Sequence, residues 1–407
     1  MKFRKTRFFL FSLITITSFL SACSNKIEGV ETPISEPEPE TVDIQEKEDP
    51  CLTLIPDLDI PTESAPQSDI DSIQIAWFYK PPDDETIMED IVDHFDFYIL
   101  TKNDEDERDY MKSLGADESF YQYFRFEAIF QPEQCLDSPR NNQVAYLPGD
   151  FCNIEEQHPD WFLKDTSGDY IQTSSEAYIH MDPGNSGWQT FSLNRMREIQ
   201  EKSGWDGVFL DNVDASLNRT RRDNIQQARY AGDSAFQEAV TNFLKMLYHS
   251  YFKPSGRPLF ANILFLKDPA IWFQYLQFLD GAMIEDFAAD WDYGFLSVED
   301  WETHLCIAEK TQQLGKEIIL VTQGDQNDLQ RQAFAFGSYL LVQQGQASFR
   351  YTNDENYRNV WMYDNYKMDI GQPLGPRYQE DGIWKREFTG GTVEVDPSAH
   401  LAQFHLK

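Results

Sequence analysis

The sequence predicts an α/β fold: a (β/α)8 TIM barrel with a short C-terminal β extension, preceded by a disordered acidic tether. Short apolar runs alternate with helical patterns from residue 73 onward, and the eight runs are the number that a closed barrel needs. About 335 residues follow position 72, enough for a barrel of ~250 residues with insertions. An open, doubly wound sheet is the alternative, but the chain lacks the Gly-rich phosphate turn of that fold.

The predicted strands are apolar runs bounded by turn residues, the pattern of parallel strands buried on both faces. They span Ile73–Tyr79, Phe95–Leu100, Tyr121–Phe130, Gly207–Leu210, Pro258–Leu264, Gly281–Ile284, Glu317–Thr322 and Ala347–Tyr351. The predicted helices repeat apolar residues at helical spacing. They include Gly187–Lys202, Asp233–Tyr251, Pro269–Phe278, Val298–Gln313 and Asp328–Val342.

These elements set the expected domain boundaries. We expect the barrel over residues 73–352 and a small β extension, packed on the barrel, over residues 353–407. The loop Gln131–His180 has some fifty residues, too many for a simple connector. We expect it to cover the barrel mouth and to shape a substrate cleft.

The N-terminus has the layout of a signal peptide over residues 1–22. Basic residues precede a twelve-residue apolar core, Phe8–Phe19, which is too short to span a bilayer because that takes ~20 residues. The segment Leu20–Cys23 resembles the lipobox of bacterial lipoproteins. By that resemblance Cys23 is the lipidated N-terminus, with ordinary cleavage and no lipid as the alternative. The implied location is the cell envelope, anchored to a bacterial membrane and facing the periplasm or the cell exterior.

Residues 23–72 predict a linker. Fourteen acids, seven prolines and one lysine lie between Glu28 and Asp71, with almost no aromatic residues. Such a composition cannot bury enough apolar surface to fold. A self-repelling, Pro-rich chain extends by ~3.1 Å per residue, so the linker is expected to hold the folded part off the membrane.

Charge and cysteines narrow the possible partners and cofactors. The whole chain has a formal net charge of −35, which disfavours nucleic acid and favours neutral or cationic ligands. Cys135 and Cys152 lie in one loop and are the expected disulfide, but four cysteines after Cys23 allow three connectivities. No Cys or His spacing indicates a metal site, no cofactor motif is present, and we expect a monomer.

Two of the predicted strands lead to acids at the same offset. Each begins with an Asp-Gly pair and three apolar residues follow; one run leads to Asp211 and the other to Glu285. The C-terminal ends of barrel strands form the mouth where enzymes of this fold hold their chemistry. Asn262 in the fifth strand and Gln323 after the seventh add polar side chains, so we expect all four to converge.

The stretch from residue 159 to residue 214 carries a specific pattern. Its motifs are Pro159–Asp165, Gly168, Met181–Asn185 with Trp188, and Gly204–Asp214. They resemble family fifteen of the hypothetical glycosyl hydrolases, a family of barrel proteins, and more distantly the endo-α-1,4-polygalactosaminidases and the wider α-glycosidase barrels. The likeness extends over residues 73–400, although Asp396 stands where the family more often has Asn. The resemblance implies a barrel glycosidase and leaves its substrate open.

Two carboxylates suffice for that chemistry. Cleaving a glycosidic bond needs a general acid on the leaving oxygen and a nucleophile or base on the opposite side of the sugar. We assign Asp211 as nucleophile and Glu285 as acid/base of a membrane-anchored, extracytoplasmic glycoside hydrolase acting on a poly- or oligosaccharide. The likeness of Asp211 to the strand-four Asp of α-glycosidase barrels implies an α linkage. Carboxylates well beyond ~10 Å apart would refute the pairing.

Each acid also has a structural interpretation. Asp211 could cap a helix. It could also pair with a nearby cation, namely Arg219, Arg221 or Arg222.

The remaining acids also have more than one possible role. A one-residue shift in register would exchange Glu285 for Asp286, which we also count as a substrate-binding residue. Asp214 could orient Asp211, contact a sugar hydroxyl or cap a helix. Asp182 begins an Asp-Pro-Gly-Asn turn, so it either binds sugar or serves the turn.

Aromatic residues make up 14% of the chain, and some fall near predicted strand ends. Sugars present C–H faces that pack on flat rings, so we expect Tyr79 and Trp291 to line the cleft. Most of the other aromatic residues belong to the core.

Other functions remain to be weighed. The chain has no Gly-x-Ser-x-Gly elbow, phosphate loop, dinucleotide fingerprint or His-Glu-x-x-His motif. A non-catalytic glycan-binding lipoprotein on a barrel scaffold is the main alternative, and a structural envelope lipoprotein is a third. Incubation with an intact glycan distinguishes the three functions. A hydrolase shortens the glycan, a binding protein binds it intact, and a structural protein does neither.

Overall fold

The computed structural model of the chain describes residue 51 and residues 73–82, 87–172, 177–219, 225–291, 294–353 and 356–407. The predicted signal peptide, the lipidation site Cys23 and the 23–72 linker apart from Cys51 lie outside the described residues. Within these ranges no helix has both the length and the apolar character that a membrane crossing requires.

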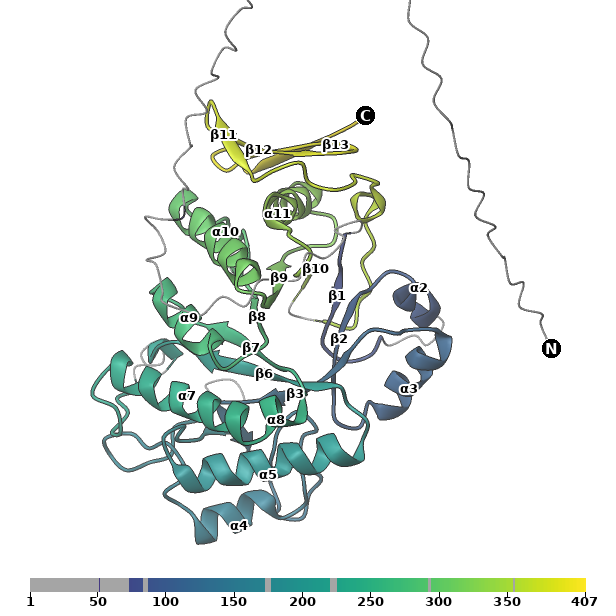
Figure 1. Cartoon of the computed structure of the whole chain (residues 1–407). Coiled ribbons are helices and arrows are strands. Elements are labelled where there is room, and N and C mark those ends of the chain that lie inside the picture. Colours follow the sequence, from purple (N-terminus) through teal and green to yellow (C-terminus); the bar gives the residue numbers. More distant parts are fainter. Residues whose placement is uncertain are drawn as a thin grey trace, which may run out of the picture. The chain divides into compact units, whose positions relative to one another are not determined.

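Eight parallel strands form the barrel (Figure 1). The strands in order around the barrel are β1 (Ala76–Trp77), β2 (Phe97–Thr101), β3 (Phe120–Arg125), β6 (Gly207–Asp214), β7 (Leu259–Leu264), β8 (Gly281–Ile284), β9 (Glu317–Gln323) and β10 (Ala347–Thr352). A parallel bridge between Ile75 and Phe349 joins the first strand to the last, and Phe349 N–H donates to the Gln74 carbonyl at 2.9 Å. The predicted closed barrel is confirmed.

Helices alternate with these strands along the chain (Figure 1). They are α2 (Met88–Val92), α3 (Glu105–Leu114), α4 (Asp150–Gln157), α5 (Ser186–Lys202), α7 (Asp233–Leu247), α8 (Lys253–Ser255), α9 (Pro269–Leu276), α10 (Val298–Gln313) and α11 (Leu329–Val342). A π-helical turn, η2 (Tyr248–Phe252), joins α7 to α8. The helix predicted to run through Tyr251 therefore changes its winding after Leu247.

The strands differ from the predicted ones mainly at three places. Of the predicted strand Ile73–Tyr79, only Ala76–Trp77 form β1. The predicted strand Tyr121–Phe130 is two strands, because the chain leaves the barrel after Arg125 and forms β4 (Ala128–Phe130), which pairs with β5 (Tyr178–His180). β6 continues four residues beyond the predicted Leu210, so Asp211 lies inside the strand and not after it.

Alternation along the strands divides the core in two. A cluster inside the barrel includes Phe209 of β6 and Met283 of β8. The residues on either side of Phe209, Val208 and Leu210, belong to the larger cluster shared with the helices. Because side chains alternate between the two faces of a strand, every second residue points into the barrel.

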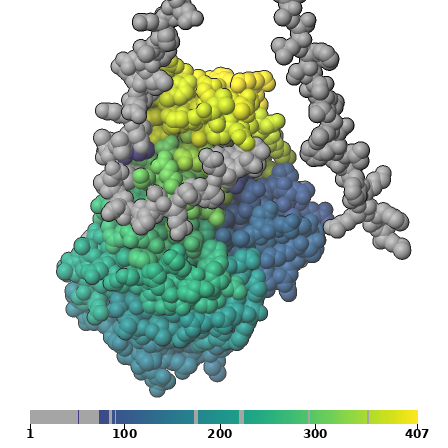
Figure 2. Space-filling model, in the orientation of Figure 1, coloured from purple at the N-terminus to yellow at the C-terminus, as the bar shows by residue number. Residues whose placement is uncertain are grey.

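The C-terminal residues form an antiparallel sheet of β11 (Tyr378–Glu380), β12 (Ile383–Phe388), β13 (Gly391–Asp396) and β14 (Leu401–Leu406). It packs on α11, and Figure 2 shows the C-terminal residues in yellow beside green residues of the barrel. Gly337 of α11 permits the close approach, since a Cβ there would lie 2.7 Å from that of Ala402. Arg386 donates to the Leu340 and Gln343 carbonyls at the end of α11, at 3.0 and 2.6 Å. The predicted β extension is confirmed.

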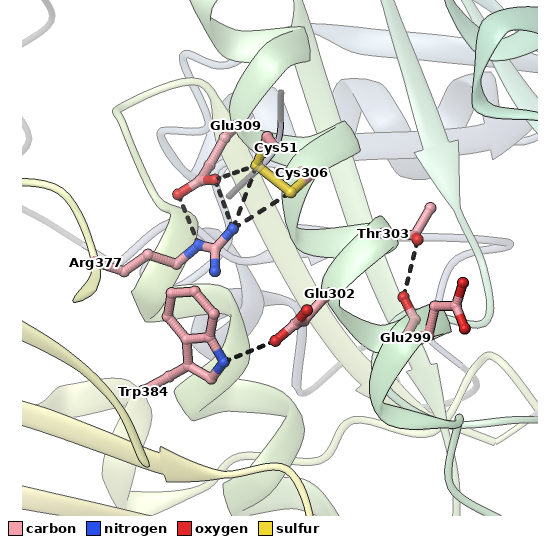
Figure 3. Close-up of a disulfide and its surroundings, with 8 residues drawn as sticks. All are labelled: Cys51, Glu299, Glu302, Thr303, Cys306, Glu309, Arg377 and Trp384. Carbon is pink, nitrogen blue, oxygen red and sulfur yellow. Dashed lines mark hydrogen bonds and ion pairs between the residues drawn. A yellow bond between two sulfur atoms is a disulfide. The ribbon is translucent and has the colours of Figure 1, made fainter. Parts of the chain in front are cut away.

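The described residues contain two disulfides, one local and one between distant parts of the chain. The predicted Cys135–Cys152 bridge is confirmed. The second joins Cys51 to Cys306 on α10, across 255 residues (Figure 3). Arg377 lies against it, pairing with Glu309 at 2.9 Å and stacking on the Trp384 ring at 4.1 Å. The C-terminal sheet and the residue that precedes the barrel therefore meet at α10.

Candidate active site

A cleft of about 680 Å³ opens among the C-terminal ends of the barrel strands. Its lining includes the two predicted catalytic acids, Asp211 and Glu285, and the predicted binding residues Tyr79, Asp286 and Trp291. This volume lies within the ~300–1,000 Å³ that small-molecule sites occupy.

Strand alternation explains why the acids point into the mouth. Asp211 lies two residues after Phe209, and Glu285 lies two residues after Met283, so each continues the inward-facing side of its strand. Asp286 lies three residues after Met283, so alternation would turn it to the opposite face of the strand. The strand register therefore favours Glu285 over Asp286 as the inward acid.

A local irregularity in β6 positions Asp211. The register between β6 and β7 shifts between Leu210 and Val213, and Asn212 has a φ of 59°. Asn tolerates this left-handed conformation better than most residues, and such bulges re-aim side chains. The Asp211 carboxylate accepts hydrogen bonds from the Tyr123 hydroxyl, from Asn212 Nδ2 at 3.1 Å and from Asn262 Nδ2 at 2.9 Å.

Glu285 is less exposed to solvent than Asp211, with 7% of its surface exposed. Its Oε1 accepts from the Tyr357 hydroxyl at 2.9 Å, and its Oε2 accepts from Asn262 Nδ2 at 2.5 Å. Burial raises the pKa of Glu285 to about 8, and the negative charge of Asp211 adds to the rise, while the two hydrogen bonds oppose it. This shift favours the protonated form of Glu285.

Asn262 ties the two acids together. Its Nδ2 donates to Asp211 Oδ1 at 2.9 Å and to Glu285 Oε2 at 2.5 Å, so these two oxygens lie no farther apart than the sum of the two distances, about 5.4 Å. Asn262 is itself buried. Asn262 is not part of the cleft lining but contacts residues that are. The same holds for Gln323, whose Nε2 donates to the Tyr357 hydroxyl at 3.1 Å.

Aromatic rings form one wall of the cleft. The Tyr79 ring packs on that of Tyr123 at 4.6 Å and on that of Tyr357 at 6.2 Å. Burial raises the pKa of Tyr79 to about 12, so its hydroxyl stays protonated. Trp291, which precedes α10, and His304, on α10, also line the cleft.

Two predicted binding residues lie elsewhere. Asp182 is absent from the cleft lining; it accepts hydrogen bonds from the Tyr230 hydroxyl and from Gly184 N–H at 2.9 Å, the second of which closes the Asp-Pro-Gly turn. Asp214 is buried and paired with Arg219, whose Nε and Nη2 each lie 2.9 Å from it. The arginine considered as a partner for Asp211 thus binds Asp214 instead, and Arg221 and Arg222 lie outside the described residues.

The loop Gln131–His180 lies beside the mouth and supports the cleft without lining it. None of its described residues is part of the cleft lining. The Asn142 side chain, however, is hydrogen-bonded to the cleft residue Tyr79 and accepts from the Tyr178 hydroxyl at 3.0 Å. Leu163 and His180 border a smaller cavity of about 30 Å³, which shares Asn212 and Arg219 with the cleft.

Sequence reasoning missed Tyr123, Tyr357 and His304. Tyr123 shares the inward parity of Tyr121 on β3, so strand alternation could have found it. Tyr357 lies between β10 and the C-terminal sheet, where no periodic pattern predicts its position. His304 lies on a helix whose register relative to the mouth depends on packing.

The described residues offer one grouping of metal-ligating atoms within 4.8 Å of one another, Cys51, Cys306 and Glu309. The two sulfur atoms of that group are joined as a disulfide. This group is not part of the cleft lining, whose polar side chains include carboxyl groups, phenols, the Asn212 amide and His304.

Comparison with solved structures gives similarities at low identity. The glycoside hydrolase domain of PelA from Pseudomonas aeruginosa has 15% identity and a TM-score of 0.47, over 72% of this chain and 98% of that one. The maltogenic α-amylase AmyB from Thermotoga neapolitana has 10% identity and a TM-score of 0.46, over 81% of this chain and 87% of that one. A GH31 dextranase from Flavobacterium johnsoniae has 10% identity and a TM-score of 0.48, over 75% of this chain and 39% of that one. Scores at this level carry no conclusion about substrate or mechanism.

Comparison with families is more specific. No curated protein matches the chain. A family model described as hypothetical glycosyl hydrolase family 15 matches residues 136–392, more than half of the sequence. The chain belongs to hypothetical glycosyl hydrolase family 15 and is a glycosidase on a (β/α)8 barrel.

Proposed function

We propose that the protein is a retaining glycoside hydrolase in which Asp211 is the nucleophile and Glu285 the acid/base. The observation that carries the proposal is the shared donor Asn262, which holds an oxygen of each acid within about 5.4 Å of the other. Retaining enzymes separate their two carboxyl groups by ~5–5.5 Å, whereas inverting enzymes need ~6.5–9.5 Å to admit a water.

In the first step a carboxylate oxygen of Asp211 attacks the anomeric carbon, and the bond from that carbon to the glycosidic oxygen breaks. Glu285 gives its proton to the departing oxygen. Its raised pKa suits this role, because a carboxyl group of ordinary acidity would be ionised at neutral pH. The product of this step is a glycosyl ester on Asp211.

In the second step Glu285, now a carboxylate, takes a proton from water, and the water oxygen attacks the anomeric carbon. The ester bond to Asp211 breaks, which restores both acids to their starting states. Two displacements at one carbon leave the anomeric configuration unchanged.

The substrate and location complete the proposal. A poly- or oligosaccharide suits an open cleft with an aromatic wall, and the sequence resemblance supports an α linkage. The N-terminal pattern supports export and a lipid anchor on Cys23, which would place the hydrolase in the cell envelope. Mass spectrometry of the mature N-terminus tests the anchor.

The activity is tested by incubating the purified full-length protein with a panel of α-linked and amino-sugar polysaccharides. We expect one class to be shortened, with products resolved by mass spectrometry. Proton NMR at early times should show the anomer of the substrate in the first product. Inversion would refute Asp211 as nucleophile, and binding without shortening would favour the glycan-binding alternative.

Asp286→Asn is the matched control for Glu285→Gln. Both changes remove an acid from neighbouring positions of one cleft. We expect Asp286→Asn to keep turnover with a changed KM, while Glu285→Gln loses turnover. The reverse pattern would transfer the acid/base role to Asp286.

A further inference from the structure

We propose that Tyr357, which lies beyond the last barrel strand, is a positioning residue that fixes the carboxyl group of Glu285 for proton transfer. The inference rests on the proposed function, since it concerns the acid of that reaction. It makes the segment Asn356–Tyr363, between β10 and the C-terminal sheet, part of the active site.

The Tyr357 hydroxyl has one donor and one acceptor. It accepts from Gln323 Nε2 at 3.1 Å and donates to Glu285 Oε1 at 2.9 Å. Because Gln323 supplies a hydrogen to the phenol oxygen, the phenol's own hydrogen is directed at Glu285. Asn262 occupies the other carboxyl oxygen, so the carboxyl plane is held from both ends.

The ring of Tyr357 is held as firmly as its hydroxyl. It packs on Phe78 at 5.1 Å and on Tyr79 at 6.2 Å, both at the end of β1. These contacts are kept when the hydroxyl alone is removed, which makes Tyr357→Phe a clean test.

Buried arginine fixes the backbone that carries this ring. Arg350 of β10 is 3% exposed, donates to the Phe78 carbonyl, and donates through Nη2 to the Tyr357 carbonyl at 2.8 Å. On the other side, Arg358 Nε donates to the Pro81 carbonyl at 2.8 Å. The segment Asn356–Tyr363 is therefore fastened to both the last and the first strand of the barrel.

The electrostatics agree with this geometry. Burial, and then the charge of Glu285, raise the pKa of Tyr357 well above its usual range, so the phenol remains a donor throughout the working pH range. Its hydrogen bond lowers the pKa of Glu285 against the larger effect of burial. Removing the hydroxyl should therefore raise the pKa of Glu285 further.

The test compares wild type, Tyr357→Phe and the matched control Tyr363→Phe. Tyr363 lies in the same segment, but its hydroxyl donates to the Gln326 carbonyl at 3.0 Å, away from the cleft lining. On the polysaccharide that wild type shortens, we expect Tyr357→Phe to lower kcat about tenfold or more with little change in KM. The limb of the pH profile on which activity falls with rising pH should move to higher pH. Tyr363→Phe should leave both unchanged.

A second measurement needs no substrate. The carboxyl band of Glu285, identified in the infrared spectrum by its absence in Glu285→Gln, is followed as the pH is raised. We expect it to titrate at higher pH in Tyr357→Phe than in wild type and in Tyr363→Phe. If no polysaccharide is cleaved, the proposed hydrolysis fails, and this titration alone decides the role of Tyr357.

Three outcomes would overturn the inference. The titration of Glu285 could be the same in Tyr357→Phe and wild type. A fall in kcat without any movement of the pH profile would assign Tyr357 to holding the segment in place. Equal effects from Tyr363→Phe would point to the same structural role.

Discussion

The ends of β6 and β8 each present one acid to the same cleft, but the two acids have different surroundings. Asp211 is partly exposed and accepts from three side chains, while Glu285 is almost fully buried and accepts from two. Burial favours the protonated form of Glu285, whose pKa is raised to about 8. Environment, more than residue type, therefore separates a nucleophile from a general acid.

The largest effect should come from the β6 end. Asp211→Asn removes the proposed nucleophile and is expected to lower kcat by about 10⁴-fold or more, because the proposed mechanism has no step that bypasses the glycosyl ester. Circular dichroism should show unchanged folding, since Asn keeps the side-chain volume. Measurable turnover near the wild-type rate would remove Asp211 from the mechanism and with it the contrast between the two ends.

The β8 end should show a smaller effect that depends on the leaving group. Glu285→Gln is expected to lower kcat by roughly 10²–10⁴-fold on a polysaccharide, because general acid catalysis contributes about that much. Aryl glycosides with an acidic phenol need no proton, so their first step should be nearly unaffected. A comparison of both substrate types in stopped-flow assays checks this. Equal losses on both would argue against an acid at Glu285.

The pH profile should locate the buried acid. Because Glu285 must hold a proton and its pKa is about 8, kcat/KM should fall about tenfold per pH unit above that value. The limb should be absent when Glu285→Gln is assayed on an aryl glycoside with an acidic phenol. A limb that survives this change belongs to another group.

The smallest effect concerns stability. The pKa of Glu285 rises from 4.5 to about 8 on folding, so its contribution to stability is complete below pH 4.5 and is lost as the pH rises through about 8. Glu285→Gln should therefore raise Tm by about 2–4 °C at pH 9 and much less at pH 4. Asp211→Asn, at the more exposed end, is the comparison. A Tm difference for Glu285→Gln that is the same at both pH values would contradict the buried, protonated state.

Local patterns were enough to predict the barrel and the inward acids. Apolar runs identified all eight strands because parallel strands are buried on both faces. The offset from the Asp-Gly pair predicted Asp211 and Glu285, and Asn262 was predicted as a polar residue within the apolar fifth strand. Asp182 was left open between sugar binding and the turn that it begins, and in the structure it accepts from Gly184 N–H within that turn.

Contacts between distant residues were not predictable in this way. Tyr357 reaches Glu285 because Arg350 holds its backbone, an arrangement that depends on barrel closure. The bridge from Cys51 to Cys306 spans 255 residues, and spacing favours near pairs such as Cys135 and Cys152. The pairing of β4 with β5 in the long loop was not predicted, because one apolar run joins β3 to β4 in the sequence.

The Cys51–Cys306 disulfide decides where the chain that precedes the barrel is attached, because Cys306 lies on α10. Under the proposed lipid anchor on Cys23, the 27 residues 24–50 separate the anchor from this attachment point while the bridge is closed. Opening the bridge would move the attachment point to the start of the barrel and add the 22 residues 51–72 to that connection. Reduction of one bond on α10 would then lengthen the connection between the proposed anchor and the cleft.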